Sequence, residues 1–463
     1  MRLRRMALVL VLALVSVLGC AADIGPDDVT TLDEGDDALN GTQTFTGSVS
    51  ATGTSWIAHA FDVTAPAQIS ATLSWTNAAA DLNMFLRDPS GTGVAQATTT
   101  SQPETLSFNA TTSGRWSIGV KARSGSSSYT LTVRVSSSLK PTCRGLMTRA
   151  GMPDSTTAYV DAAVAHVEWR ALESSDQVFD GPGWAAIDRM VSAGYATRIR
   201  VYAGISSPDF VKRLGHTPVS AGGIDCSRTG GIAVVNPQSG IAQCSSFFWT
   251  APALDEYEEL MAEVARRYEG APEVREVVDS ACMTVYAEPF FRAHGDFGSN
   301  QRLANAGLNL AVDRACHERA IRIHERYFPR TRTALAINSW DVIDPTDSDY
   351  HRVSWPEAHA FADWARSVMG SRLVLQNNGL GESDDCGAGT SVDTSVYCYL
   401  GSIAGPKGFQ TETWERLGGA TGLYDALDNA LSMGANFVEL PGGFKDANQS
   451  TLADYDRRLQ ATP

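Results

Sequence analysis

The chain has 463 residues and a formal net charge of −15, and its Lys and Arg residues form no block. This acidic balance argues against a nucleic-acid-binding protein and against a polybasic membrane patch. A single hydrophobic core rarely extends beyond about 250–300 residues, so the length predicts two folded domains.

The first twenty residues have the pattern of an export signal. Three arginines among the first five residues precede a short apolar run, Met6–Leu18, which is too short for a comfortable membrane-spanning helix. The motif that ends this segment, Val17-Leu18-Gly19-Cys20, resembles the lipobox of bacterial lipoproteins. The resemblance implies that Cys20 is lipidated and anchors an exported protein at the outer membrane or the cell surface. The alternative is an ordinary secretory signal with an incidental cysteine.

Two segments of different composition follow the signal. Residues 21–40 are acidic and lack periodic apolar residues, which predicts a disordered linker. From 41 to 137 the sequence changes to short alternating runs rich in Thr, Ser and Val, such as Gln68–Trp75, with Gly, Pro, Asn and Asp between them. This alternation predicts a small antiparallel β-sandwich domain.

Four segments of this domain carry a family pattern, namely Leu73–Trp75, Asp81–Gly91, Gly114–Val120 and Tyr129–Leu131. They resemble the bacterial pre-peptidase C-terminal domain, a module that accompanies secreted hydrolases. Some relatives bind calcium, and the resemblance places Asp81 and Asn83 in the matching stretch, although so few carboxylates make a weak calcium site. Trp75 and Trp116 are either sugar platforms or core residues, and aromatic residues in alternating strands are more often core.

After residue 138 amphipathic helices alternate with short apolar runs. This pattern predicts an α/β fold, a (β/α)8 TIM barrel over residues 138–463. The eight expected strands are Gly145–Thr148, Val164–Trp169, Arg198–Tyr202, Val277–Tyr286, Thr333–Ile337, Arg372–Gln376, Gly408–Thr411 and Asn436–Leu440. The expected helices include Trp184–Ala193, Leu254–Tyr268, Ala304–Tyr327, one that opens at Ser354 with a capping box, and Tyr424–Met433.

Export permits disulfide bonds, and two cysteine pairs are close in sequence. Cys226 with Cys244 and Cys386 with Cys398 lie in Gly-rich loop segments, so each pair is a candidate disulfide. No CxxC spacing occurs, which argues against a metal site made of cysteines. The sequence leaves open the pairing of Cys143, Cys282 and Cys316.

Two glutamates follow expected strands of the barrel. Glu288 comes after strand four and Glu412 after strand seven. Catalytic residues of such barrels lie at the C-terminal ends of strands, and these two strands face each other across the barrel mouth. The carboxyl groups can therefore converge on one bond, as retaining glycoside hydrolysis requires, at a separation of about 5–5.5 Å. The alternative for each glutamate is an ordinary loop-capping or ion-paired role.

Further segments that accompany these glutamates are Glu168–Glu173, Arg198–Gly204, Ser207-Pro208 and Arg267-Tyr268. Together they resemble the retaining (β/α)8-barrel glycosidases of clan A, which include cellulases and β-galactosidases. The resemblance implies that Glu288 is the acid/base, that Glu412 is the nucleophile, and that Arg170 is the neighbour that keeps the nucleophile ionised. It also implies a saccharide substrate.

The sequence departs from the clan pattern in two places. Ala287 stands where the clan has an Asn that holds the substrate 2-hydroxyl, and Asn377 and Asn378 at the end of strand six are possible replacements. The eighth strand ends in Glu439 and a Leu-Pro-Gly-Gly-Phe segment instead of an aromatic platform. Glu439 is the best alternative to the two catalytic candidates, ahead of Glu168, Glu173, Asp279 and Asp341.

Several aromatic residues are candidates for contact with sugar rings. The long loop 214–250 contains Phe247-Phe248-Trp249 and is expected to form a cleft wall. The alternative for each aromatic side chain is packing against neighbouring loops. The other candidates are Tyr202, Trp340, Tyr397, Tyr399 and Trp414.

Other functions fit the sequence less well. A peptidase is disfavoured because neither an HExxH motif nor a GxSxG motif occurs. His317 and His324 have charged neighbours and are expected to be solvated. No cofactor is expected beyond a weak possibility of structural calcium in the β-sandwich. The main competing hypothesis is a non-catalytic surface lipoprotein whose degenerate barrel binds a saccharide or another envelope component.

Overall fold

The computed structural model describes residues 41–52, 56–63, 65, 67–137, 139–149, 151–236, 239–290, 292, 296–384, 386, 391–392 and 395–462. The expected signal segment 1–20 with Cys20, and the linker 21–40, lie outside the described residues. Among the helices that are described, none is both long and apolar enough to cross a membrane.

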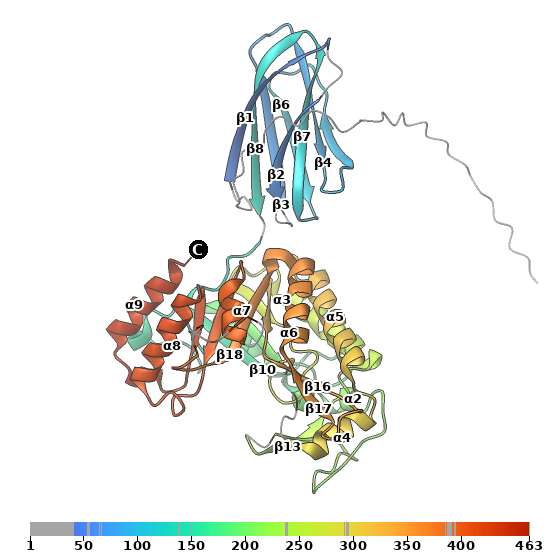
Figure 1. Ribbon diagram of the computed structural model, residues 1–463, viewed down its shortest axis with the longest axis vertical. Helices are drawn as coiled ribbons and strands as arrows, with labels where there is room; N and C mark the ends of the chain where they lie inside the picture. Colours follow the sequence, from blue (N-terminus) through green and yellow to red (C-terminus); the bar gives the residue numbers. More distant parts are fainter. Residues whose placement is uncertain are drawn as a thin grey trace, which may run out of the picture.

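The first folded part is a β-sandwich of two antiparallel four-stranded sheets (Figure 1). One sheet has the order β1 (Gly41–Ser50), β8 (Ser126–Ser137), β3 (Ala67–Trp75) and β6 (Glu104–Ala110). The other has the order β2 (Ile57–Val63), β7 (Gly114–Ser124), β4 (Asp81–Arg87) and β5 (Gly93–Ala97). Strand β3 alternates buried and accessible positions along its length, as the sequence pattern predicted.

Trp75 and Trp116 belong to the core of this sandwich. Their exposed fractions are 6% and 2%. The indole nitrogen of Trp75 donates to the carbonyl of Ala80 at 2.9 Å, and that of Trp116 donates to the carbonyl of Thr112 at 3.0 Å. Because both rings are buried and both nitrogens are satisfied, neither side chain is a sugar platform.

The second folded part is a closed barrel of eight parallel strands surrounded by helices (Figure 1). The predicted TIM barrel preceded by a β-sandwich is therefore confirmed. Strand β20 pairs with β9, so the last strand closes the ring onto the first. In barrel order the strands are β9 (Gly145–Thr148), β10 (Ala162–Glu168), β11 (Ala196–Tyr202), β14 (Val274–Val278), β15 (Arg332–Ala336), β18 (Leu373–Leu380), β19 (Lys407–Thr411) and β20 (Phe437–Leu440).

Nine α-helices and five 3-10 helices are described. The α-helices are α1 (Trp184–Ser192), α2 (Asp209–Lys212), α3 (Ala251–Tyr268), α4 (Phe297–Asn305), α5 (Leu310–Tyr327), α6 (Trp355–Met369), α7 (Val396–Ser402), α8 (Ala420–Ser432) and α9 (Gln449–Gln460). The 3-10 helices are η1 (Ser155–Thr157), η2 (Trp169–Ala171), η3 (Gly204–Ser206), η4 (Gly370–Arg372) and η5 (Phe444–Asp446).

Two expected element boundaries are wrong. The fourth barrel strand was expected to reach Tyr286 but ends at Val278, because the apolar residues after it pack beneath the helices instead of continuing the strand. The expected helix Ala304–Tyr327 is two helices. It breaks at Asn309, whose side chain accepts hydrogen bonds from two backbone amides of the first turn of α5 and so starts a new helix.

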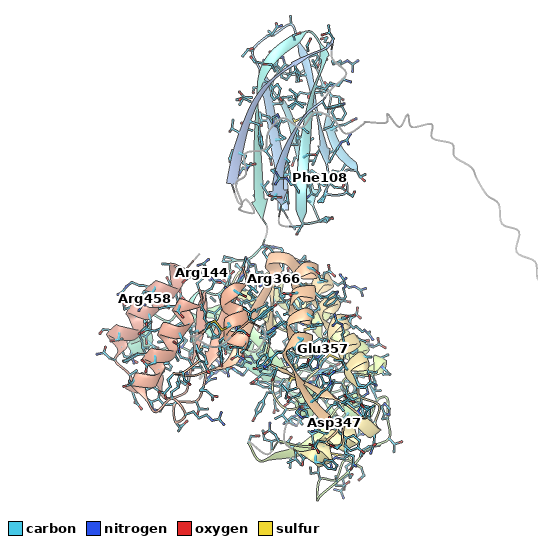
Figure 2. All side chains as sticks on the ribbon, viewed as in Figure 1. Phe108, Arg144, Asp347, Glu357, Arg366 and Arg458 are labelled. Carbon is cyan, nitrogen blue, oxygen red and sulfur yellow. A yellow bond between two sulfur atoms is a disulfide. The ribbon has the colours of Figure 1, made fainter. Side chains whose placement is uncertain are left out.

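Two hairpins lie beyond the barrel strands. Strands β12 (Ile232–Asn236) and β13 (Ile241–Ser245) form one inside the long loop after β11. Strands β16 (Trp340–Ile343) and β17 (His351–Ser354) form the other after β15. Asp347, in the turn of the second hairpin, lies at the opposite end of the barrel from Arg144 and Arg366 (Figure 2).

Three disulfides are present among the described residues. Both predicted pairs are confirmed, Cys226 with Cys244 and Cys386 with Cys398. The pairing that the sequence left open joins Cys282 to Cys316, and Cys143 is a buried free thiol.

The expectation that His317 and His324 are solvated is wrong, because both side chains are fully buried. They are seven residues apart, which is two helical turns, and so they lie on the same inward face of α5. His324 Nε2 lies 2.9 Å from the hydroxyl of Tyr257, and His324 Nδ1 lies 3.2 Å from the hydroxyl of Thr333. Charged neighbours in sequence therefore did not indicate exposure here, since they occupy the other face of the helix.

Candidate active site

Glu288 lies in the segment after β14, ten residues beyond Val278. The side-chain amide of Asn338, two residues beyond β15, donates to Glu288 Oε2 at 2.6 Å. Loss of hydration raises the pKa of Glu288 to about 7, although Asn338 and Arg200 act in the opposite direction. A carboxyl group with such a pKa is about half protonated near neutral pH, which suits a general acid/base.

A short series of amides extends from Glu288 along the strand ends. Asn377 Nδ2 donates to Asn338 Oδ1 at 2.6 Å and to the carbonyl of Ile337 at 3.1 Å. Asn378 is close enough to Glu288 to lower the pKa of that carboxyl group. The structure thus brings both Asn377 and Asn378 to the candidate site, as predicted. Sequence analysis missed Asn338, although its place just after an expected strand was a usable signal.

Glu412 follows the last residue of β19 directly, and its backbone amide donates to the carbonyl of Leu380 at 2.9 Å. Arg416 Nη1 lies 3.1 Å from both carboxylate oxygens of Glu412. Arg149 Nη2 donates to the backbone carbonyl of Glu412 at 3.1 Å. Two arginines from different strand ends therefore hold this residue, one through its side chain and one through its backbone.

The resemblance assigned the arginine beside the nucleophile to Arg170, and the structure corrects this. Arg170 lies in η2 and pairs with Glu168 at 2.8 Å, with nearly half of each side chain exposed. The carboxylate two residues earlier in the chain captures the guanidinium, so Arg170 does not contact Glu412. Arg416, four residues after Glu412, is the arginine that pairs with this carboxylate.

The two glutamates share one electrostatic environment. The negative charge of Glu412 contributes to the raised pKa of Glu288. Both carboxyl groups also act on Tyr397 of α7, whose pKa is raised mainly by burial and then by Asp384. The hydroxyl of Tyr397 donates to the carbonyl of Gly379 at 3.0 Å. A Cβ atom placed on Gly379 would lie 3.8 Å from Glu412 Oε1, so this glycine borders the carboxylate directly.

Below these groups, buried ion pairs fill the inside of the barrel. Glu439 Oε1 accepts from Arg198 Nη1 at 2.7 Å and from Arg200 Nη2 at 2.6 Å, and Arg198 also pairs with Glu276. All four side chains are at most 1% exposed. Burial alone would raise the pKa of Glu439, but Arg200 and Arg198 overcome that effect and lower it to about 2. Glu439 is thus a buried, charged support for the barrel floor, held through Oε1, while its Oε2 makes no hydrogen bond to described residues.

Tyr202 lies at the end of β11 above this floor. Its hydroxyl is 3.1 Å from Nδ1 of His166 on β10, and burial raises its pKa. Trp414 is partly buried and borders Gly443, where a Cβ atom would lie 2.9 Å from the indole. Both residues therefore remain near the mouth, where the sequence placed them.

Three of the proposed aromatic platforms lie away from any free face. Trp340 is fully buried and donates to Asp313 at 2.8 Å. Trp249 is 8% exposed and packs against Phe248 with ring centroids 5.0 Å apart. Tyr399 is stacked on a histidine ring and donates to Asp363 at 2.7 Å. All three are therefore packing residues, but Trp340 and Tyr399 pack against helix α6 and not against loops as expected.

The remaining carboxylates raised by the sequence serve structural contacts. Glu173 is 1% exposed and accepts from the Trp169 indole at 2.7 Å. Asp341 accepts from the backbone amide of Arg292 at 3.0 Å. Asp279 is buried, and burial raises its pKa to about 7.

The sandwich also contains buried acidic residues. Glu104 is 1% exposed, and neither of its carboxylate oxygens makes a well-formed hydrogen bond within the described residues. The same holds for Oδ1 of Asp81 and Oδ1 of Asn83. Burial raises the pKa of Glu104, Thr99 partly offsets this, and the charge of Asp81 adds to it. Carboxylate oxygens are ligands that Ca²⁺ prefers, so Asp81 and Glu104, which influence each other electrostatically, are the residues that fit the ion that the resemblance implied. Asn83 alternates with the core-facing Leu82 and Met84 and so lies on the other face of β4.

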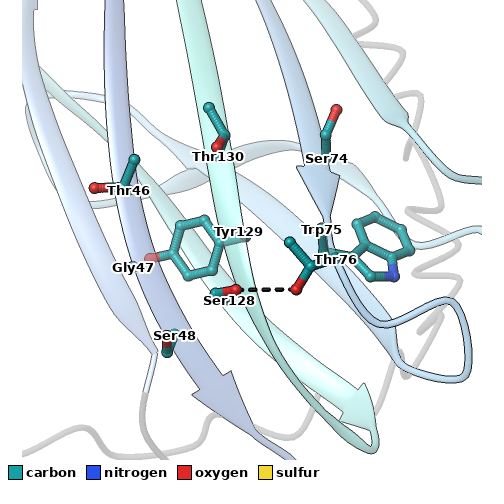
Figure 3. Close-up of a pocket in the computed structure, with 9 residues that line it drawn as sticks. All are labelled: Thr46, Gly47, Ser48, Ser74, Trp75, Thr76, Ser128, Tyr129 and Thr130. Atoms are coloured by element: carbon teal, nitrogen blue, oxygen red, sulfur yellow. Dashed lines mark hydrogen bonds between the residues drawn. The ribbon is translucent and has the colours of Figure 1, made fainter.

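The sandwich also has a groove of about 580 Å³ along β1, β3 and β8 (Figure 3). Hydroxyl groups dominate its lining, and the hydroxyls of Ser128 and Thr76 lie 3.0 Å apart. The hydroxyl of Tyr129 is 2.7 Å from His59 Nε2. No carboxylate is among the residues that line this groove, so it lacks the acid pair that hydrolysis requires.

Comparison with known proteins matches the sandwich and the barrel separately. Residues 41–122 match the bacterial pre-peptidase C-terminal domain, which confirms the resemblance of the sandwich to that domain. That domain of a Bacillus anthracis collagenase is 21% identical and covers 22% of this chain and 99% of its own, with a TM-score of 0.18.

The barrel region is similar to solved glycosidases. The β-glycosidase BGL167 is 13% identical over 66% of this chain and 84% of its own, with a TM-score of 0.33. An endo-glycoceramidase II from a Rhodococcus species is 13% identical over 67% of this chain and 78% of its own, with a TM-score of 0.36. The architecture itself rests on the closed order of the eight strands.

Proposed function

We propose that this protein is a retaining glycoside hydrolase that acts on an extracellular oligo- or polysaccharide and is tethered to the cell surface as a lipoprotein. The observation that carries the proposal is the contrast between Glu288, whose pKa is raised to about 7, and Glu412, which is ion-paired with Arg416. Different environments for two neighbouring carboxyl groups separate an acid from a nucleophile. The export signal expected from the sequence and the three disulfides support action outside the cytoplasm.

In the first step, a carboxylate oxygen of Glu412 attacks the anomeric carbon, and the bond from that carbon to the glycosidic oxygen breaks. Glu288 gives its proton to the departing oxygen. In the second step, Glu288, now a carboxylate, takes a proton from water, and the water oxygen displaces Glu412 from the anomeric carbon. The configuration of the sugar is retained because the carbon is inverted twice.

The contact between Arg416 and Glu412 favours a second candidate. Arg416 bonds both oxygens of the carboxylate, and Ala287 stands in place of the amide that would hold the substrate 2-hydroxyl. A barrel in which this ion pair never opens would bind a saccharide without cleaving it. The second candidate is therefore a non-catalytic saccharide-binding lipoprotein.

Hydrolysis of a panel of aryl glycosides separates the two candidates. Wild type should release the aryl group, and Glu288→Gln and Glu412→Gln should each lower kcat by on the order of 10²–10⁴-fold, as expected for loss of a positioned acid or nucleophile. Glu168→Gln is the matched control, because its carboxylate is exposed and pairs with Arg170. Proton NMR of the earliest product should show retained configuration.

Full activity in both folded glutamine variants, or inverted product, would contradict the proposal. Saccharide binding without turnover by wild type would establish the second candidate.

A further inference from the structure

The barrel mouth contains an arginine that has no carboxylate partner. Arg149 follows directly after β9 and is partly buried. Its one described hydrogen bond joins Nη2 to the backbone carbonyl of Glu412 at 3.1 Å. Within the described part of the chain, no carboxylate oxygen lies within the 4.0 Å of its guanidinium that would make an ion pair.

The floor of the barrel is neutral without Arg149. Two arginines, Arg198 and Arg200, are matched there by two carboxylates, Glu276 and Glu439. Above the floor, Glu412 is already paired with its own neighbour, Arg416. Arg149 is therefore a surplus positive charge beside the residue that would attack the sugar.

Protein groups compensate this charge incompletely. Burial lowers the pKa of Arg149, Arg200 lowers it further, and the attraction of Glu439 and Glu412 does not restore it. A partly buried cation that lacks a counter-charge destabilises the folded state, so a compensating role is expected. Such groups cluster at functional sites, where a ligand supplies the missing charge.

Two more nitrogen atoms next to Arg149 lack partners. Nε of Arg200 and Nε2 of His166 are buried and make no hydrogen bond to described residues. His166 and Arg200 are paired in register on β10 and β11, and Arg200 is 1% exposed. His166 is neutral, because burial, assisted by Arg200, lowers its pKa to about 3. When the Tyr202 hydroxyl donates to Nδ1, Nε2 carries the proton and is a donor.

We propose that Arg149 binds a carboxylate of the sugar that Glu412 attacks, so that the substrate class is a glycoside of a uronic acid, with His166 and Arg200 as supporting donors. This inference rests on the proposed function. A planar guanidinium binds a planar carboxylate through two parallel hydrogen bonds, which gives both charge and orientation. The hydrogen bond from Arg149 to the Glu412 backbone fixes the guanidinium beside the attacking residue and thereby selects the position of the sugar acid group.

The test compares matched pairs of aryl glycosides that differ only in the acid group. Aryl β-glucuronide is paired with β-glucoside, and β-galacturonide with β-galactoside. Wild type should prefer the uronide in at least one pair. Arg149→Gln should lower kcat/KM for that uronide by on the order of 10- to 100-fold more than it lowers kcat/KM for the neutral partner, the scale of a hydrogen bond to a charged group. Arg149→Lys should retain part of the uronide activity.

Arg170→Gln is the control, because this exposed arginine contacts Glu168 and lies outside the site. Folding is followed by thermal unfolding, in which Arg149→Gln should be at least as stable as wild type. Preference for the neutral partner in both pairs, or equal losses on uronide and neutral partner in Arg149→Gln, would overturn the inference and leave the proposed function intact.

If no aryl glycoside is cleaved, the proposed function fails and binding still decides the inference. In calorimetry, glucuronate and galacturonate should bind wild type more tightly than the neutral sugars and should bind Arg149→Gln no better than them. Absence of this difference would overturn the inference on its own.

Discussion

The sandwich and the barrel each exclude water from their interior, but they fill it with different side chains. Between the two sheets of the sandwich lie Ile69, Leu73, Leu82 and Ile118, all fully buried and apolar. The barrel floor instead holds two arginines and two glutamates that neutralise one another. An apolar layer lies beneath them, and the guanidinium of Arg198 rests 4.0 Å from the ring centre of Phe437.

This difference separates stability from chemistry within one chain. Burial of apolar surface stabilises a fold by about 25 cal/mol per Å², whereas a buried ion pair contributes little net free energy because both charges lose hydration. Apolar packing dominates the interior of the sandwich and stabilises it. The barrel retains a layer of buried ion pairs directly under Glu288 and Glu412. This layer adds little net stability, but it fixes the electrostatic field and the position of the side chains above it.

The largest effect is expected from breaking the charged layer. Glu439→Gln removes the carboxylate that Arg198 and Arg200 share, and leaving buried charges unpaired costs about 3–5 kcal/mol. Chemical denaturation should show this loss in the barrel transition and none in the sandwich transition. The pKa of Glu439 is lowered in the fold, so its stabilising contribution is present above the unfolded value near 4.5 and disappears as the pH falls towards about 2. An unchanged barrel transition in this variant would show that the shared carboxylate of Glu439 does not support the barrel.

The matching change in the sandwich is Leu82→Ala. It removes a fully buried side chain from between the sheets, and such changes cost about 2–5 kcal/mol. The sandwich transition should move accordingly, while kcat/KM on any cleaved substrate should stay unchanged. Thr72→Ala, at an accessible position of β3, is the control. A loss of activity in Leu82→Ala would mean that the two parts are not independent.

Calcium is expected to stabilise the sandwich and not the barrel. An ion held by Asp81 and Glu104 would compensate carboxylate oxygens that the protein leaves unsatisfied. At 100 times Kd the gain is about 2.7 kcal/mol, which would appear as a higher Tm of the sandwich transition than in a chelator. Glu104→Gln should abolish the response to calcium and should raise the Tm measured in chelator. An identical Tm with calcium and with chelator would exclude the site.

The smallest effect concerns a single hydrogen bond. Asn338 donates to Glu288 and thereby favours the charged carboxylate, so Asn338→Ala should raise the pKa of Glu288 above about 7. The alkaline limb of the kcat/KM profile, where Glu288 loses its proton, should move to higher pH by less than about one unit. A shift to lower pH would show that Asn338 does not act on Glu288 in this way.

Much of the fold was predictable because local patterns determine it. Apolar runs bounded by turn residues located all eight barrel strands, and alternation located the sandwich. The error at the fourth strand arose because the residues after Val278 are also apolar, and only tertiary packing under the helices decides where the strand ends. The error at His317 and His324 arose because burial follows the face of a helix and not the charge of the nearest residues.

The site was predictable only where a residue follows a strand. Glu288, Glu412 and Asn377 were found in this way. Arg149 was not, because its contact with Glu412 joins strand ends far apart in sequence. The pairing of Arg416 with Glu412 was also missed, although its spacing of four residues was a usable local signal. The resemblance suggested Arg170 instead, and a local contact with Glu168 overrides that suggestion.

The pairing of the first barrel strand, β9, with the last, β20, determines the order in which the two domains are able to fold during synthesis. The sandwich needs nothing beyond residue 137 for its sheets, so it is able to form early as the polypeptide emerges. Strand β9 comes next, yet one of its two neighbours, β20, begins only at Phe437. The C-terminal helix is required as well, because Asp456 of α9 accepts the backbone amide of Leu146 at 2.7 Å. Until helix α9 has been made, the polypeptide therefore carries one finished module and one open sheet that depends on protection from aggregation.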